Sequence, residues 1–185
     1  MKKLKNVILI AVFLCGSLAL AQAEKWVTIE AKEAGYKIDF PTSPVAQSQE
    51  IPSELGVLDM KFFMLDNSLD TNADNLVYMS AHTKYPKEFV NDGSKSFTDN
   101  ILDGVVNGAA NNVGGTLLSD KKILFKESPG RAVKIQIPGG IIVNMRIVLI
   151  ENSLYVYQTI CNEAKDDNAK MIKFFDSFDL ISTTK

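Results

Sequence analysis

The sequence predicts an α+β domain in which an antiparallel β-sheet of about seven or more strands packs against helices. Two observations predict this class. Most of the chain consists of short, alternating apolar runs bounded by turn residues, as in half-buried strands. Two segments far apart in the sequence instead repeat apolar residues every three or four positions, which is typical of amphipathic helices. Because each helix needs a surface to cover its apolar stripe, we expect both helices to lie on the sheet.

The first 23 residues have the layout of a cleaved secretory signal peptide. Three lysines precede an apolar run at residues 7–20, and Ala21-Gln22-Ala23 fits an A-x-A cleavage site. One alternative is a membrane-spanning helix, for which the run is too short. The other is a lipoprotein anchor at Cys15, which would require a small residue where Leu14 stands. We expect cleavage near Ala23 and a soluble, periplasmic or secreted protein.

The remaining residues, 24–185, fit a single domain, since domains typically hold about 100–200 residues. The whole chain has 20 basic and 22 acidic residues, and loss of the leader lysines makes it more acidic. Nucleic-acid binding is therefore not expected, because an acidic protein is not attracted to phosphate backbones. Only Cys161 remains after cleavage, which excludes an internal disulfide. Its apolar strand indicates a small buried residue rather than a reactive thiol.

Strand patterns occupy both halves of the chain. Apolar residues alternate with polar ones, and Gly, Pro, Asn and Ser gather between the runs. Turns are predicted at residues 33–35, 52–56, 128–130, 138–140 and 151–153. The predicted strands are residues 26–29, 36–40, 45–51, 57–65, 76–83, 116–126, 133–137, 141–150 and 154–161.

The first helix is predicted around residues 97–109, where apolar residues recur four positions apart. Ser96 is expected to cap its N-terminus, and Gly114 suits its C-terminal stop. Gly104 and Gly108 lie inside the segment, and each costs about 1 kcal/mol of helix propensity relative to alanine. We interpret them as places where the helix approaches the sheet closely. The alternative is a flexible segment that becomes ordered on binding.

The closing helix carries one methionine and three phenylalanines on one face, between Met171 and Phe178. Asp166 or Asp167 is expected to cap it. Burial of each phenylalanine contributes about 1.5–3 kcal/mol. We therefore expect removal of this helix to unfold the domain.

Several short motifs follow one another in a characteristic order. They are Gly-Tyr-Lys-Ile-Asp-Phe-Pro at residues 35–41, the central helix, Gly130-Arg131, a strand with Arg146, Leu154-Tyr155, and Phe-Phe-Asp-Ser-Phe at residues 174–178. In this order they resemble the PsbP-like proteins, a superfamily that also includes a Ran-binding nuclear import factor. The resemblance covers nearly all of residues 24–185 and rests on order and spacing.

This resemblance implies an antiparallel sheet sandwiched by helices, an α/β/α arrangement. It also implies a non-enzymatic role, because the known members are mostly photosystem assembly or stabilising subunits and protein-binding factors. No member's binding residues match positions in this chain. The leader lacks the Ser- and Arg-rich composition of a chloroplast transit peptide, which argues against a photosynthetic role.

The strongest local candidate for a ligand site is residues 70–75. Asp70, Asn72 and Asp74 occupy the first, third and fifth positions of a calcium-loop pattern. Asn75 replaces the usual glycine, although asparagine can adopt a left-handed turn. The twelfth position is an alanine instead of the bidentate glutamate. We interpret the segment as a solvated loop, with a weak calcium site as the alternative, and we expect no other cofactor.

Other chemistry-bearing residues stand apart from one another. His82 has no second histidine or cysteine to join it, so we interpret it as a plain residue at a strand end. Glu30, Glu33, Glu50 and Glu54 include enough carboxylates for the acid pair of a glycosidase, but the sequence places no two of them together. The chain has no nucleophile-elbow, phosphate-loop or dinucleotide-binding motif.

We therefore expect an exported, non-catalytic binding or accessory domain that acts through contacts with proteins. The alternatives are an envelope hydrolase with dispersed site residues and a carrier of small apolar molecules in the gap between sheet and helix. An enzyme should have a deep pocket with at least two convergent titratable groups. A carrier should have a large apolar cavity. A protein-binding domain should have an exposed apolar patch or an open sheet edge.

Overall fold

The computed structural model describes residues 25–53, 56–87 and 95–181, so the predicted signal peptide lies outside the described residues. The elements are β1 (Val27–Ala31), β2 (Tyr36–Phe40), β3 (Val45–Ser53), β4 (Gly56–Asp66), β5 (Val77–Lys84), α1 (Lys95–Asn112), β6 (Thr116–Phe125), β7 (Ser128–Ile137), β8 (Ile141–Ile150), β9 (Ser153–Asn162), the short 3-10 helix η2 (Glu163–Lys165), α2 (Ala169–Asp176) and β10 (Asp179–Leu180).

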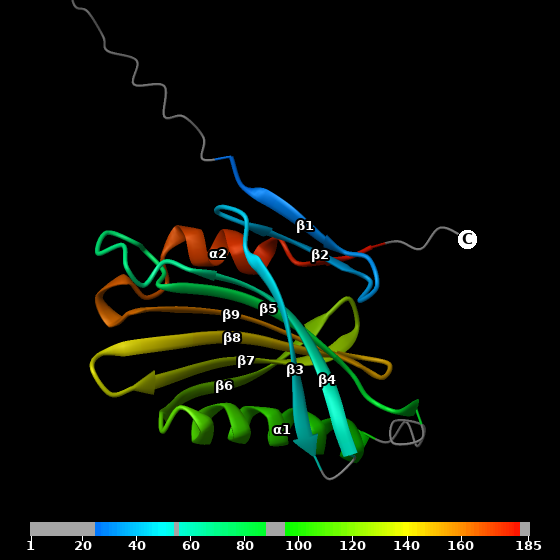
Figure 1. Cartoon of the computed structure of the whole chain (residues 1–185). Coiled ribbons are helices and arrows are strands. Elements are labelled where there is room, and N and C mark those ends of the chain that lie inside the picture. Colours follow the sequence, from blue (N-terminus) through cyan, green and yellow to red (C-terminus); the bar gives the residue numbers. More distant parts are fainter. Residues whose placement is uncertain (1–24, 54–55, 88–94, 182–185) are drawn as a thin grey trace, which may run out of the picture.

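The strands form two antiparallel sheets. The large sheet has seven strands in the order β3-β4-β5-β9-β8-β7-β6, and the small sheet has three in the order β1-β2-β10. Figure 1 shows α2 and the small sheet on one face of the large sheet and α1 on the other. This arrangement confirms the predicted α+β sandwich. The two helices cover opposite faces of the same sheet.

Aromatic side chains fill the layer between the large sheet, the small sheet and α2. Alternate residues of β2 and β9 point into this layer, among them Tyr36 and Tyr157. Phe174 of α2 has no exposed surface, and its ring centroid lies 5.2 Å from that of Phe40 and 5.3 Å from that of Tyr78. Edge-to-face ring pairs of this kind add to the energy of apolar burial. The closing helix is therefore part of the aromatic core, as its apolar stripe predicts.

The opposite face of the large sheet is covered by α1. Leu102 and Val106, one helical turn apart, are buried in an apolar cluster with residues of β7 and β8. Arg131 of β7 is only 3% exposed, and its guanidinium forms ion pairs with Asp103 and Asp99 of α1. A buried cation requires such partners, so these contacts hold the helix in one position on the strands.

The turn between β6 and β7 differs from the prediction. The turn predicted at residues 128–130 is wrong because β7 includes those residues; the chain reverses at Lys126 and Glu127, whose φ angles are 44° and 72°. Two-residue hairpin turns with positive φ usually contain Asn or Gly, so this pair carries no recognisable signal. Pro129 is tolerated in β7 because pairing with β8 begins only at Gly130.

The first helix ends as predicted but begins differently. α1 starts at Lys95, so Ser96 lies inside the helix and not before it. Gly114 has φ 58°, and the N–H of Gly115 donates to the carbonyl of Ala110 at 2.9 Å. This is the hydrogen-bond pattern of a Schellman C-terminus, in which a left-handed glycine ends the helix.

The predicted caps of the last helix are wrong. Asn168 caps α2, because its side-chain oxygen accepts a hydrogen bond from the backbone N–H of Met171 at 2.8 Å. Asp166 and Asp167 lie before the cap, and their carboxylates bind a lysine of β7 instead. Phe178 is buried as expected but lies beyond the end of α2.

The interpretation of the two glycines inside α1 as close-approach sites is also wrong. A Cβ atom placed on Gly104 or Gly108 would have no neighbouring heavy atom within 4 Å. Tight packing against the sheet therefore does not require glycine at either position.

Gly104→Ala should stabilise the protein by roughly 0.5–1 kcal/mol, because alanine restricts the unfolded chain and the helix has room for its methyl group. Chemical denaturation of both proteins would measure this. Gly114→Ala is the matched control and should destabilise, because alanine is strained at φ 58°. Equal effects of the two substitutions would contradict the conclusion that a side chain fits at Gly104 and not at Gly114.

Candidate functional site

A groove with a volume of about 620 Å³ lies between the turn that joins β1 to β2 and the β3 side of the large sheet. We call it the β3 groove. Its walls come from four separate stretches of the chain. They are residues 30–34 with Tyr36, residues 46–48, residues 61–63, and His82.

Small residues at the sheet edge leave room for this groove. In the strand register, Ala46 of β3 stands opposite Phe63 of β4, and Ser48 stands opposite Lys61. Side chains two residues apart on a strand share one face of the sheet. Ala46 and Ser48 therefore lie on the face of the large sheet that carries the small sheet. Both side chains are small, so neither fills the space beside the β1–β2 turn.

Hydrogen bonds hold the β1–β2 turn above the sheet. The hydroxyl oxygens of Tyr36 and Ser80 lie 3.0 Å apart, and the hydroxyl of Tyr155 donates to the carbonyl of Ala34 at 2.9 Å. Burial raises the pKa of Tyr36 to about 12, so this hydroxyl stays protonated at neutral pH. The groove thus has one wall on each sheet, and side-chain bonds between the sheets set its width.

One ion pair joins the two walls. The ammonium nitrogen of Lys61 lies 3.0 Å from a carboxylate oxygen of Glu33. The hydrogen bond to Lys61 lowers the pKa of Glu33, and the same bond raises the pKa of Lys61. Both side chains are exposed, so the pair contributes little to stability. It places one charge of each sign at the rim of a mainly apolar groove.

His82 lies near the end of β5, on the floor of the groove. Its ring centroid is 5.1 Å from that of Tyr155, and its Nε2 atom is buried with no hydrogen-bond partner among the described residues. Burial, followed by the charges of Lys84 and Lys61, lowers the pKa of His82, so the ring is neutral at pH 7. Within residues 25–53, 56–87 and 95–181, no group of three or more His, Cys, Asp and Glu side chains is placed to hold a metal ion.

The free edge of β3 borders the groove. Among the residues that the structure describes, β3 pairs only with β4, and its residues from Val45 to Glu50 are exposed on both faces. Between Val45 and Gln49 this strand has no charge and no proline, although Pro52 stands near its end. The other edge of the large sheet, β6, contains Lys121, Lys122 and a bulge before Ser119. Lysines and bulges discourage pairing with another strand, so β3 is the less protected edge.

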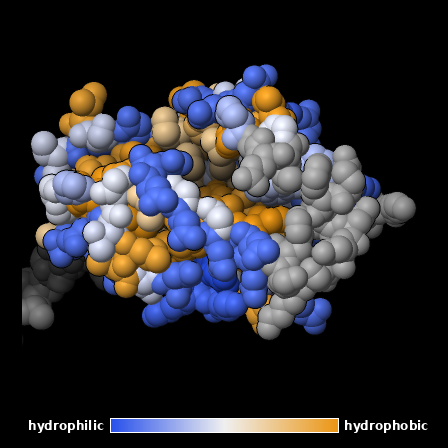
Figure 2. All heavy atoms as spheres, turned by 90° about the horizontal axis from the view of Figure 1, so that it is seen from below, coloured by the Kyte–Doolittle hydropathy of each residue, from blue (hydrophilic) through white to orange (hydrophobic). Residues whose placement is uncertain are grey.

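A second groove, of about 330 Å³, lies on the opposite face between α1 and strands β4, β5 and β9. Its lining includes Met60, Met79 and Met145, and Gly108 borders it from the helix. Figure 2 shows this side of the molecule, with hydrophobic residues in a hollow between hydrophilic ones. This is the gap between sheet and helix in which the sequence suggested a carrier site.

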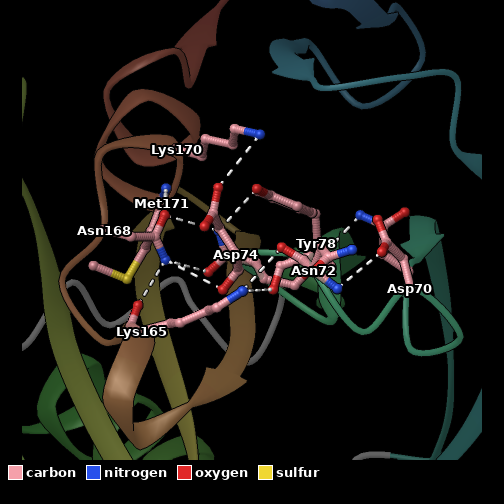
Figure 3. Close-up of polar contacts among 11 residues, drawn as sticks. Asp70, Asn72, Asp74, Tyr78, Lys165, Asn168, Lys170 and Met171 are labelled. Atoms are coloured by element: carbon pink, nitrogen blue, oxygen red, sulfur yellow. Dashed lines mark hydrogen bonds and ion pairs between the residues drawn. The ribbon is translucent and has the colours of Figure 1, made fainter.

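The predicted calcium loop has other polar partners (Figure 3). A carboxylate oxygen of Asp70 accepts the backbone N–H of Asn72 at 2.9 Å, and Asp74 forms an ion pair with Lys170 at 3.3 Å. Lys165 donates to the carbonyl of Asn72 and to the next carbonyl, each at 2.9 Å. Lys170 therefore lies against the Asp74 carboxylate that a calcium ion would need, whereas Lys165 binds main-chain carbonyls of the loop. The weak calcium site remains an untested prediction.

Asn75 anchors this loop to α2. Its side chain is 1% exposed, donates to the hydroxyl of Tyr78 at 2.8 Å, and exchanges hydrogen bonds with the side chain of Asn168. Its φ is not positive, so it does not replace glycine in a left-handed turn. The sequence pattern suggested a ligand loop, whereas Asn75 connects two elements that are far apart in the chain.

The four candidate acids do not all gather at one place, but two of them share a groove. Glu30 and Glu33 both line the β3 groove, and each has a lysine partner, Lys32 at 3.9 Å for Glu30 and Lys61 for Glu33. Glu50 is exposed on β3, and Glu54 lies outside the described residues.

Cys161 is fully buried, and burial is the main cause that raises the pKa of its thiol to about 11. This agrees with the predicted small buried residue. None of the helices in the described part of the chain is long and apolar enough to cross a membrane.

No family model and no curated protein sequence matches the chain. The solution structure of cyanobacterial PsbP from Synechocystis is similar to it, with a TM-score of 0.57 and 9% sequence identity over 90% of this chain and 98% of that one. A protein of unknown function from Pseudomonas aeruginosa covers 76% of this chain and 85% of its own length with 10% identity, at a TM-score of 0.33 that is too low to indicate a shared fold. The chain has a PsbP-like fold.

Proposed function

We propose that the protein is an exported, non-catalytic binding domain that accepts an extended segment of another protein as an additional strand along β3. The observation that carries this proposal is the free edge of β3, which is uncharged from Val45 to Gln49. Main-chain groups on its outer side have no strand partner within the described residues. Such edges bind extended peptides through main-chain hydrogen bonds, while neighbouring pockets select side chains.

The β3 groove supplies the neighbouring pocket. A strand added to β3 would lie about 4.8 Å from it, and alternate side chains of that strand would face the side on which Ala46 and Ser48 border the groove. The lining is mainly apolar, and the pair of Lys61 and Glu33 stands at the rim. We therefore expect the bound segment to place an apolar side chain in the groove.

Export is proposed from the leader alone. If the chain is cleaved as the leader predicts, mass spectrometry of the protein recovered after export should find an N-terminus at Glu24. Recovery of the intact chain outside the cytoplasm would contradict cleavage.

Site-specific photo-cross-linking tests strand addition. A benzophenone amino acid in place of Gln47 should form an adduct with one partner, at one stretch of its sequence. A synthetic peptide of that stretch should then bind the purified protein and slow hydrogen exchange of β3 amides, because added-strand hydrogen bonds protect them. A peptide that leaves exchange in β3 unchanged would rule out this binding mode.

The opposite edge of the sheet provides the control. The same photoreactive residue at Leu124, which is 75% exposed on β6, should give no such adduct. Lysine in place of both Gln47 and Gln49 should weaken binding of the peptide at least roughly tenfold, because lysines on an edge strand oppose pairing. Adducts of equal yield from both edges would indicate non-specific contact.

A second candidate function is the transport of small apolar molecules. The sequence suggested the gap between sheet and helix as its site, but the greater volume of the β3 groove favours that groove instead. The two functions predict different results for one variant. Ala46→Phe should fill the groove and abolish binding of an apolar fluorescent probe. If such a probe binds without protecting β3 amides, and no peptide binds, the carrier function replaces strand addition.

A further inference from the structure

On the face of the large sheet that α2 and the small sheet cover, toward the β6 edge, the strand register brings three cations together. Lys121 of β6 and Arg146 of β8 both stand opposite Ala132 of β7. In the adjacent row, Lys134 of β7 stands between Ser119 and a residue of β8. Because Ala132 is small, an open space remains between the two cations that flank it.

These residues line a groove of about 230 Å³ that is more polar than the β3 groove. Its walls include all three cations, together with Asn144 and Phe175. Neither the β3 edge nor the β1–β2 turn contributes to its lining. The two grooves share no lining residue and are therefore separate sites, so a ligand of one does not depend on a ligand of the other.

Arg146 is the unusual member of the cluster. It is partly buried, and within the described residues no carboxylate lies within ion-pair distance of its guanidinium. Its guanidinium carbon lies 4.9 Å from the ring centroid of Phe175, and one nitrogen makes a long hydrogen bond of 3.4 Å to the carbonyl of Met145. Partly buried charges are normally paired. The aromatic ring holds this one in place and leaves most of its donors unused.

The acidic neighbours are already engaged. Lys134 lies 2.5 Å from a carboxylate oxygen of Asp166 and 3.1 Å from one of Asp167. Asn144 donates to Asp166 at 2.9 Å. These two carboxylates more than offset the charge of Lys134, and Asp167 also lines the groove. Lys121 has no ion-pair partner in the described part of the chain, so Lys121 and Arg146 together outweigh the one surplus negative charge. The groove therefore presents the positive charges of Lys121 and Arg146.

We propose that this groove binds a compact oxyanion, the phosphate or carboxylate group of a small molecule, between Lys121 and Arg146 above Ala132. A guanidinium binds both groups through paired hydrogen bonds. The volume of the groove suits a small anion and not a folded partner. Phe175 offers an apolar surface to the part of the ligand next to the anionic group.

The test is an NMR titration of the full protein with sodium phosphate, and separately with sodium acetate, at constant ionic strength set by sodium chloride. Backbone amides of Lys121, Ala132 and Arg146 should shift in a saturable manner at millimolar anion. Saturation by either salt supports the site, and the tighter salt identifies the preferred oxyanion. Shifts spread over lysines elsewhere, or an absence of saturation with both salts, would overturn the proposal.

Variants separate a specific site from general attraction of anions. Arg146→Gln should weaken binding roughly tenfold or more, because charged hydrogen bonds are lost, and Arg146→Lys should restore only part of it. If the Arg146 variants do not fold, Lys121→Gln serves as the test instead, because it replaces an exposed side chain and should also weaken binding. Lys122→Gln, on the other face of β6, is the matched control and should leave binding unchanged. Equal affinity of Lys121→Gln and Lys122→Gln would count against the site.

Discussion

Phe174→Ala should lower the free energy of unfolding by about 3–5 kcal/mol, as expected for truncation of a fully buried phenylalanine. Phe174 has no exposed surface and contacts the rings of Phe40 and Tyr78. The substitution would leave a cavity where α2, the small sheet and the large sheet meet. Since domains are typically stable by about 5–15 kcal/mol, the variant should be close to unfolding. Urea denaturation of both proteins would measure the difference.

The matched control lies in the same helix. Ile172 is 50% exposed, so Ile172→Ala should change stability by less than about 1 kcal/mol, because alanine regains helix propensity. A similar loss from both substitutions would mean that α2 contributes through its helical structure and not through the aromatic core.

Gly130→Ala should destabilise by about 1–3 kcal/mol or more, as overpacking of a close contact does. A Cβ atom on Gly130 would lie 2.4 Å from the backbone oxygen of Ile147 and 3.2 Å from a side-chain carbon of Ile123. The first neighbour belongs to the main chain of β8, so it cannot move aside without disturbing the pairing of β7 with β8. Thermal unfolding followed by circular dichroism would detect the loss.

Gly104→Ala serves as the reference for this second substitution. Both changes add one methyl group, but only the one at Gly130 meets a backbone atom. We expect opposite signs for the two changes in stability. If Gly130→Ala were neutral, β7 and β8 would have to separate more easily than their long antiparallel register suggests.

Much of the fold could be predicted because strand and helix periodicities are local properties. The alternation in residues 36–40 and the helical spacing after Met171 each follow from a single buried face. The missed features depend on less distinctive signals. Lys126 and Glu127 form the β6–β7 turn without glycine or asparagine, and Asn168 acts as a cap next to two aspartates that look equally suitable.

The candidate sites could not be predicted in the same way. The β3 groove is lined by four stretches that lie between residues 30 and 82 of the chain. No spacing rule relates Glu33 to Lys61, or Lys121 to Arg146, until strand order and register are known. The loop around Asp70 had a ligand-like spacing, and only the fold shows that Lys170 pairs with Asp74 and that Lys165 binds the main chain of the loop.

The amino-acid sequence by itself determined which segments form strands and helices and which of their faces are apolar, because periodic burial requires a matching local order of apolar and polar residues. Tertiary structure alone decided that β3 is the exposed edge, that a groove opens beside it, and that Lys121 and Arg146 flank Ala132. These features arise from pairing between strands that are distant in the chain. A one-residue change of register would move every side chain to the other face.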